Sequence, residues 1–419
     1  MLYRTCRSAV LVWAILGLFL AIPGSPLPAD ARTGAYEVRF EDIETIMRAE
    51  SPRAKIITQE VASVAAARDR SRMWSNPSLA YEHEENSLFR EGQVSLRKRF
   101  DQPFAQGGLS EGWDGIVASA ELRGMQESEN LLVEMKAGYV RLKLTESYLD
   151  RLARFGEVVD LAHAVARDRH AEGALSGAEK QLIRLATFSL EATARRVRQD
   201  QRRGEADWRV AMGLPSSSSL RLVTPVTFRP LSLDDVAHYE ALLSGRPGSR
   251  SRETLAVALG RQAEASKPGL VPAFDIYGGY KRFADEYDGF VAGIAVDLPL
   301  FSGNSGAAKK LEAERLIVEN RLSMDMALCR EEIAALVVSI GEAGESLADI
   351  TGDLDPDEPL TDHLLLQYRE GTLSLDALLG AIQIEASALE SYYDELAAYY
   401  LNIFRLETIT GATIARFEP

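Results

Sequence analysis

The sequence predicts a mainly α-helical protein with a small β part, assembled from one module that occurs twice. Three observations support this fold class. Proline positions recur at a nearly constant spacing, so that Pro52 matches Pro247 and Pro77 matches Pro272, each 195 residues further on. Two long segments contain no proline and keep a helical pattern, and four runs of about ten residues alternate apolar and polar side chains.

The matching positions divide the chain into two repeats of the same layout. Residues 1–31 are predicted to be a signal peptide, residues 32–230 the first repeat and residues 231–419 the second. Each repeat is expected to contain a helix, two short strands, a very long helix, a turn with glycine and a returning helix. This pseudo-symmetry indicates that function comes from shape and not from one catalytic pocket.

The first 31 residues have the layout of a secretory signal. Arg4 and Arg7 precede an uncharged apolar run from Ala9 to Ile22, and residues 29–31 (Ala-Asp-Ala) match the small residues of a cleavage site. The alternative is a retained anchor helix, but the run is shorter than the ~20 residues that cross a bilayer. We therefore expect the mature chain to begin at Arg32.

The mature chain is acidic, and this excludes some partners. The whole sequence has a net charge of −15, and loss of the signal, which carries +1, leaves −16. Such a charge repels phosphates, so we expect no nucleic-acid partner. Cys329 is the only thiol left after cleavage, which rules out a disulfide within the chain. The best later apolar run, Ile333 to Gly341, is under half of a helical span, so any membrane crossing must be made by strands.

The four alternating runs are predicted to form two hairpins, one in each repeat. Their apolar positions are expected on one face: Leu79, Tyr81, Val94, Leu96, Phe100, Phe274, Ile276, Tyr280, Phe290, Ala292, Ile294, Val296 and Leu298. In the first hairpin we expect Glu82 to lie opposite Arg97. A run of about ten residues is the length of a tilted strand that crosses a membrane in a barrel. Soluble hairpins have the same alternation.

Four strands cannot close into a membrane barrel by themselves. The smallest membrane barrels have about eight strands, and open edges in lipid leave backbone groups without hydrogen bonds. Three copies with four strands each give a closed 12-stranded transmembrane β-barrel, so a homotrimer is the expected assembly. A dimer with eight strands is the minimal alternative.

The helical segments outside the hairpins are very long. Residues 108–170 extend roughly 95 Å at about 1.5 Å per residue, and the chain returns through Leu182 to Met212. A further continuous helix is expected from Leu231 to Lys267, ahead of the second hairpin. In the second repeat the long helix spans Ala307 to Ile350, and a returning helix completes the module.

The last helix carries a coiled-coil seam. Its apolar residues follow one another at alternating steps of four and three: Leu375, Leu379, Ile382, Ala386, Leu389, Tyr393, Leu396, Tyr400 and Ile403. An ordinary helical hairpin has the same seam. Beside two strand hairpins, we interpret the long antiparallel coiled-coil helices as the wall of an α-helical barrel.

Five short motifs occur in a specific order along the chain. They are Ser51-Pro52, Asn76-Pro77 before the first strand, Asp297-Leu298-Pro299-Leu300-Phe301 after the fourth, Tyr368-x-Glu370-Gly371-x-x-Ser374, and the segment Leu406 to Gly411. In this order they resemble the outer-membrane efflux protein family, the TolC-like channel-tunnels, across nearly the whole mature chain. Residues 301–306 are similar to the metal-cation efflux branch, although the histidines and methionines are too scattered to be metal ligands.

The resemblance implies a trimeric β-barrel in the outer membrane that continues into a periplasmic α-helical barrel. It implies as partners a periplasmic adaptor (membrane fusion) protein, an inner-membrane pump of the resistance-nodulation-division or ABC type, and outer-membrane lipid. It implies no cofactor and no bound metal, because the substrate passes through the channel unchanged.

In such proteins the two glycine-containing turns form the periplasmic tips that contact the adaptor. The matching residues here are Gly173, Leu175, Ser176, Gly371, Leu373 and Ser374. A plain helical turn with a serine N-cap is the alternative interpretation of each turn.

Relatives often carry acidic residues just inside the tips, where rings of carboxylates narrow the pore and favour cations. Glu179 matches this pattern in the first repeat. In the second repeat the matching positions are Ala377 and Gly380, and Asp376 lies one place early. Glu179 and Asp376 are therefore the candidate residues of a pore constriction.

The predicted function is that of the outer-membrane channel of a tripartite efflux system, which exports solutes to the outside. We do not expect an enzyme, because the sequence has no phosphate-binding Gly-rich loop, G-x-S-x-G, H-E-x-x-H or paired-cysteine metal motif. A periplasmic coiled-coil scaffold or adaptor would share the signal, the acidity and the heptads, but it would not need two amphipathic hairpins. The outer-membrane duct of a one-step protein secretion system would have the same sequence features.

Overall fold

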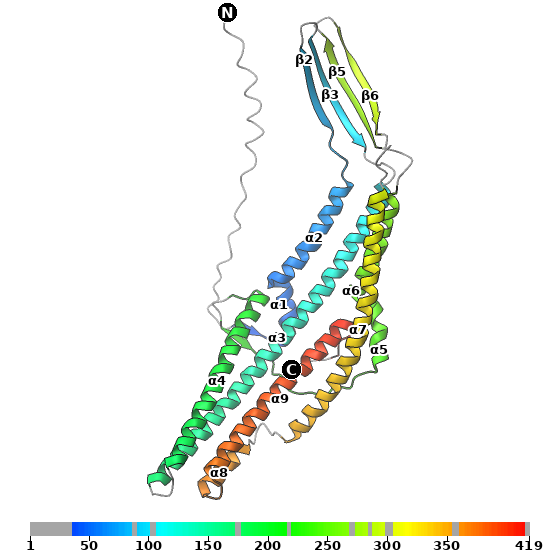
Figure 1. The fold of residues 1–419 in the computed structure, drawn as a ribbon. Helices are drawn as coiled ribbons and strands as arrows, with labels where there is room; N and C mark the ends of the chain where they lie inside the picture. Colours follow the sequence, from blue (N-terminus) through cyan, green and yellow to red (C-terminus); the bar gives the residue numbers. More distant parts are fainter. Residues whose placement is uncertain are drawn as a thin grey trace, which may run out of the picture.

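The computed structural model describes nine segments of the chain: residues 36–85, 90–100, 106–171, 177–215, 219–267, 273–283, 287–297, 305–353 and 360–414. The predicted signal peptide lies outside them. A small β-sheet stands at one end of a long helical body, and the chain end near residue 414 lies at the middle of that body (Figure 1).

Four long helices make up most of the body. Helix α3 (Gln106–Ala171) has 66 residues, which corresponds to ~99 Å. Helix α7 (Ser305–Asp353) has 49 residues, and α4 (Gly177–Met212) and α9 (Leu375–Thr410) have 36 each. The predicted long helices are therefore confirmed, and α3, α4 and α7 are each somewhat longer than predicted.

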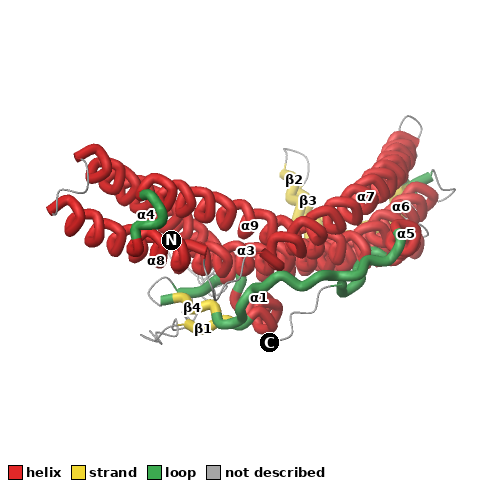
Figure 2. The backbone as a smooth tube through the Cα atoms, turned by 90° about the horizontal axis from the view of Figure 1, so that it is seen from below, coloured by secondary structure: helices red, strands yellow, loops and turns green. Residues whose placement is uncertain are grey.

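The helices form one bent layer (Figures 1 and 2). Near the sheet the order across the layer is α2 (Pro52–Arg72), α3, α6 (Pro247–Ala265) and α7. Towards the far end, α3 lies between α4 and α9, and α9 contacts both α7 and α8 (Leu360–Glu370). Helices α2 and α4 thus form one edge of the layer, and α7 forms most of the other.

The sheet joins the two predicted hairpins. Its strands are β2 (Ser78–Glu85), β3 (Arg90–Phe100), β5 (Phe274–Phe283) and β6 (Tyr287–Val296), in that order and all antiparallel. Both hairpins and their alternation are confirmed. The predicted register of the first hairpin is wrong: Glu82 lies opposite Gln93, and Arg97 lies opposite Ser78. Alternation decides which face a residue occupies but not which residue it opposes.

Two helices begin at a proline after one extended residue. Ser51, with ψ 125°, separates α1 (Ile43–Glu50) from α2, and Arg246, with ψ 134°, precedes α6. The predicted continuous helix 231–267 is wrong, because the chain forms α5 (Val236–Leu242) and a 3-10 turn (Leu243–Gly245) before this break. Proline disfavours a helical residue before it and lacks the N–H that would continue the helix.

A short parallel ribbon at the middle of the body was not predicted. Strands β1 (Tyr36–Val38) and β4 (Leu220–Leu222) pair over three residues each, and a 3-10 turn (Phe40–Asp42) leads from β1 into α1. The buried Tyr139 of α3 holds this ribbon, because its hydroxyl accepts a hydrogen bond from the Thr224 N–H at 2.8 Å and donates one to the Thr224 carbonyl at 3.1 Å. Three-residue strands are too short to give a periodic signal.

Two apolar cores stabilise the body, one at the level of the ribbon and one towards the far end. Helix α9 contributes to both. Seven of the nine predicted seam residues of α9 are buried, and the other two, Leu379 and Tyr393, are partly buried against the second core. The coiled-coil interpretation of this helix is confirmed. The division into repeats 32–230 and 231–419 stays a prediction.

Two glycines of α3 provide a matched test of this packing. A methyl group on Gly138 would collide with the ring of Trp208, which is 4% exposed and held by a 2.9 Å hydrogen bond to the Met135 carbonyl. A methyl group on Gly156 would meet nothing within 4 Å. We expect Gly138→Ala to lower the free energy of unfolding by about 1–3 kcal/mol and Gly156→Ala to raise it by about 0.5–1 kcal/mol. Thermal melting of the purified protein, monitored by circular dichroism, measures both changes. Equal melting temperatures for Gly138→Ala and Gly156→Ala would contradict this packing.

Candidate functional site

One face of the sheet is apolar and uncovered in the protomer. The register aligns Tyr81, Val94, Tyr280 and Phe290 in one row across the four strands. The predicted apolar positions with described side chains lie on this face, and its large exposed members are Leu79, Tyr81, Val94, Leu96, Ile276, Tyr280, Phe290, Ile294 and Val296. Phe290 is 91% exposed. A contiguous apolar surface of this kind marks contact with a membrane or a partner.

The opposite face of the sheet is polar and joins the two hairpins. Arg97 of β3 lies over the ring of Tyr277 of β5, 5.7 Å from its centroid. Lys281 of β5 forms an ion pair with Glu91 of β3. At the base of the sheet, Arg99 binds Asp297 at 2.7 Å. The two faces therefore differ as the wall of a membrane barrel requires, with water on one side and lipid on the other.

Both outer edges of the sheet lack a partner strand. Strand β2 pairs only with β3 and β6 only with β5, as far as the described strands extend. Each edge exposes a row of backbone N–H and C=O groups, which favours pairing with another chain. In lipid such groups must be satisfied by closure.

Aromatic side chains gather where the sheet meets the helices. Phe100 contacts Trp74 edge-on at 5.4 Å and stacks on Phe274 at 5.1 Å between centroids. Lys98 lies opposite Ile276 and so shares the apolar face, and its ammonium group reaches back to donate to the Ser75 carbonyl at this same end. Aromatic rings and a lysine that extends towards the polar boundary are typical of a membrane interface.

The turn between α8 and α9, residues 371–374, lies at the far end of the body, and we call it the tip. Gly371 has φ 83°, a left-handed conformation that favours glycine. Ser374 is the N-cap of α9, and its hydroxyl accepts from the Ala377 N–H at 3.4 Å. Leu373 packs against the second core. Arg169 of α3 donates to the Tyr368 carbonyl at 2.9 Å and stacks over that ring, so the tip is fixed to α3.

The other predicted tip cannot be compared with it. Gly173, Leu175 and Ser176 lie outside the described residues, and Glu179 lies in the first turn of α4 with an undescribed side chain. Asp376 is exposed in the first turn of α9. A hydrogen bond with the Ser374 side chain lowers the pKa of Asp376, and backbone N–H groups act in the same direction. Asp376 therefore stays ionised at neutral and mildly acidic pH.

Asp376 lies in a groove that the sequence did not reveal. The groove runs between α4 and α9, with residues of α3 at its base, and has a volume of about 550 Å³. Its lower part is mostly apolar, with Leu182, Leu185 and Leu379 beside Asp376 and Gly380. Further along it, Arg196 of α4 binds Glu390 of α9 at 2.8 Å, and Tyr148 of α3 donates to the same carboxylate at 3.3 Å.

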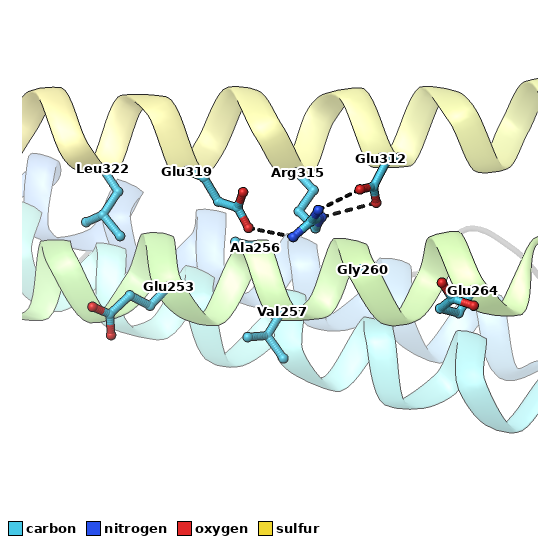
Figure 3. Close-up of a pocket in the computed structure, with 9 residues that line it drawn as sticks. All are labelled: Glu253, Ala256, Val257, Gly260, Glu264, Glu312, Arg315, Glu319 and Leu322. Atoms are coloured by element: carbon cyan, nitrogen blue, oxygen red, sulfur yellow. Dashed lines mark hydrogen bonds and ion pairs between the residues drawn. The ribbon is translucent and has the colours of Figure 1, made fainter.

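A second groove lies between α6 and α7, closer to the sheet, and has a volume of about 490 Å³ (Figure 3). Figure 3 shows Arg315 of α7 between Glu312 and Glu319. Hydrogen bonds from Arg315 lower the pKa of Glu312. Glu253 and Glu264 add two further carboxylates from α6, so the groove is acidic. Nowhere among the described residues do three His, Cys, Asp or Glu side chains gather as they would around a metal ion.

None of the described helices is both long and apolar enough to cross a membrane.

No protein-family model matches the sequence, and no curated protein is similar to it in sequence. Solved structures do match. A structure of CusC, reported with its conformational changes during folding and transmembrane channel formation, has a TM-score of 0.71 at 14% identity, over 88% of this chain and 91% of that chain. The outer-membrane channel OprN has a TM-score of 0.71 at 15% identity, over 89% of both chains.

The Campylobacter jejuni CmeC outer membrane channel is similar to the same extent, with a TM-score of 0.71 at 11% identity, over 90% of this chain and 86% of that chain. At such low identity the likeness establishes the fold. The arrangement expected from the order of sequence motifs, with long antiparallel helices below a small amphipathic sheet, is confirmed. The chain therefore has the fold of these outer-membrane channels.

Proposed function

We propose that this protein is the outer-membrane channel component of a tripartite efflux system and exports solutes from the periplasm or from an inner-membrane pump to the outside. The observation that carries this proposal is the sheet: it exposes one apolar face and leaves both edges unpaired in the described chain, at the end of a helical body ~99 Å long. The sheet would lie in the outer membrane and the helices in the periplasm.

Closure of the sheet requires further copies of the chain. Three copies would give the 12 strands of a small membrane barrel, with the apolar faces towards lipid and the polar faces, such as Arg97 and Lys281, towards water. The long helices would continue this ring as an α-helical barrel. A soluble scaffold would not be expected to expose an uncovered apolar face of a sheet to water.

The tip is proposed to contact a periplasmic adaptor, which connects the channel to an inner-membrane pump of the resistance-nodulation-division or ABC type. Gly371, Leu373 and Ser374 would form this contact together with Gly173, Leu175 and Ser176. The fixed conformation of the tip supports a docking role. The hydrogen bond from Arg169 and the Ser374 cap hold the turn in this conformation. We do not assign a catalytic reaction to the chain.

The channel is tested by measuring conductance in a planar lipid bilayer. The protein would be purified from membranes in detergent, and its oligomeric mass determined on the same sample. We expect a trimer and discrete ion-conducting steps, because a closed barrel leads into a hollow helical body. A soluble monomer or dimer that never conducts would disprove the proposal and favour a periplasmic scaffold.

The two faces of β6 predict opposite effects of a lysine. Ile294 lies on the apolar face and is 68% exposed, and Val291 lies on the polar face. We expect Ile294→Lys to lower the stability of the membrane-inserted barrel by about 2–4 kcal/mol per copy, whereas Val291→Lys is tolerated. The yield of folded trimer extracted from outer membranes measures the difference. Equal loss for both variants would contradict the assignment of the faces.

Asp376 is proposed to line a constriction near the tip, together with Glu179. We expect a cation preference that is the same at about pH 7 and pH 5, because the pKa of Asp376 is lowered from that of an ordinary aspartate, so its carboxylate stays ionised at both pH values. Asp376→Asn should reduce this preference, measured as the reversal potential in a salt gradient. Asp160→Asn, on an exposed position of α3, is the matched control. An unchanged reversal potential in Asp376→Asn would show that Asp376 does not line the pore.

A further inference from the structure

We propose that neighbouring copies join head to tail through an electrostatic seam, in which Arg198 and Arg202 on α4 of one copy pair with Glu345 and Asp349 on α7 of the next. The seam deepens the proposed function, because it rests on the assembly of several copies around one channel. It names the surface by which a second copy of this chain is recognised.

The acidic side of the seam is formed by Glu342, Glu345 and Asp349, which we call the acidic edge. All three are exposed, and no hydrogen bond or ion pair links them to the described residues. Leu347 between them is fully buried where α7 packs on α9. Glu345 and Asp349 are each two residues from it, about 200° around the helix. The acidic edge therefore faces away from the body.

The basic side is formed by Arg198 and Arg202, which we call the basic edge. Both are exposed, and neither has an ion-pair partner in the part of the chain that the structure describes. Arg196 binds Glu390 of α9 across the groove at 2.8 Å. Arg198 is about 200° further around α4, so it faces away from α9. The basic edge thus lies on the α4 side of the layer and the acidic edge on the α7 side (Figures 1 and 2).

The two edges lie at the same height along the body. Their heights can be compared because both α4 and α7 contact residues of α9. Arg196 of α4 lies level with Glu390, and α9 and α4 both run towards the sheet, so Arg198 and Arg202 lie level with residues 392 and 396. Gly344 of α7 lies next to Tyr399, and α7 runs the other way, so Asp349 and Glu345 lie level with residues 394 and 398. Each arginine is within about 3 Å in height of a carboxylate.

Equal heights matter because rotation about an axis along the helices does not change height. Each copy would then bring its basic edge to the acidic edge of the next, which is a heterologous contact that closes into a ring. Each edge alone places like charges four residues apart, which destabilises an isolated helix. A neighbouring copy with the opposite charge removes this cost.

The surfaces above the seam are complementary in shape. Near the sheet, α2 exposes small side chains at Ala62, Ala66 and Ala67. On the other side of the layer α7 exposes large ones at Leu316 and Met324. The unpaired strands follow the same sides, with β2 above α2 and β6 above α7 (Figure 1). Sheet edges, apolar surfaces and charges all support the same head-to-tail contact between two copies.

A charge exchange tests the seam. One variant carries Arg198→Glu and Arg202→Glu, a second carries Glu345→Lys and Asp349→Lys, and a third carries all four changes. We expect the trimer fraction in detergent at a fixed concentration to fall by about tenfold or more in the first two variants and to recover in the third. Arg203→Glu is the control, because Arg203 is exposed on the same helix but lines a separate hollow between α4 and α9, beside Asp394 and Ala397.

A chemical cross-link provides the second measurement. Arg202→Cys and Glu345→Cys in one chain lie on opposite sides of the layer, so a short bismaleimide can join them only between copies. We expect a covalent trimer on a denaturing gel, and none when Arg203→Cys replaces Arg202→Cys. The native Cys329 is buried and stays in place.

The outcomes separate the seam from the channel. If the protein forms a conducting trimer whose fraction does not change with the charge exchange and that gives no cross-link, the seam is disproved but the proposed function is not. A trimer that responds as expected but never conducts supports the seam and disproves the channel. A wild-type chain that stays monomeric in detergent overturns both.

Discussion

The unpaired backbone edges of the sheet are the constraint on which the rest of the structure depends. Strands β2 and β6 each leave one row of N–H and C=O groups open beside a face of bare apolar side chains. Water can satisfy these groups only outside lipid, so burial of the apolar face and closure of the sheet must occur together. Closure by identical copies places the helical layers side by side as well, so the two sides of each layer must be complementary.

The same backbone break in the two halves is stabilised by different chemistry. Before Pro52, the Ser51 hydroxyl donates to the Ala211 carbonyl at 2.6 Å. Before Pro247, the largely buried Arg246 donates to Gln126 and to the Cys329 sulfur, each at 2.9 Å. The proline fixes the local conformation, and the residue ahead of it ties the new helix to its neighbours. The two halves share a layout without sharing contacts.

The parts of the fold that the sequence predicted are those with a local period. Long helices without proline, strand alternation and the seam of α9 all follow from side chains a few residues apart. Partners far apart in the chain gave no such signal: Arg97 was assigned the wrong opposite residue, and the β1–β4 ribbon was missed. The continuous helix 231–267 failed for a different reason, since Pro247 lies within that segment and ends the preceding helix, an effect that the prediction did not take into account. Of the candidate site, the tip at Gly371 was predicted, but the grooves were not.

The charge pattern suggests how an acidic chain assembles with copies of itself. With a net charge of −15 for the whole sequence, and −16 after loss of the predicted signal, two copies repel each other at long range. Unpaired arginines on one side of the layer reverse this repulsion only at short range and only against the acidic side of another copy, because like sides repel. Backbone pairing of β2 with β6 would supply stability, and the alternation of its faces excludes slips of one residue but not slips of two. Charges at fixed heights on stiff helices restrict those registers to one, so the helical body specifies the assembly that the sheet stabilises.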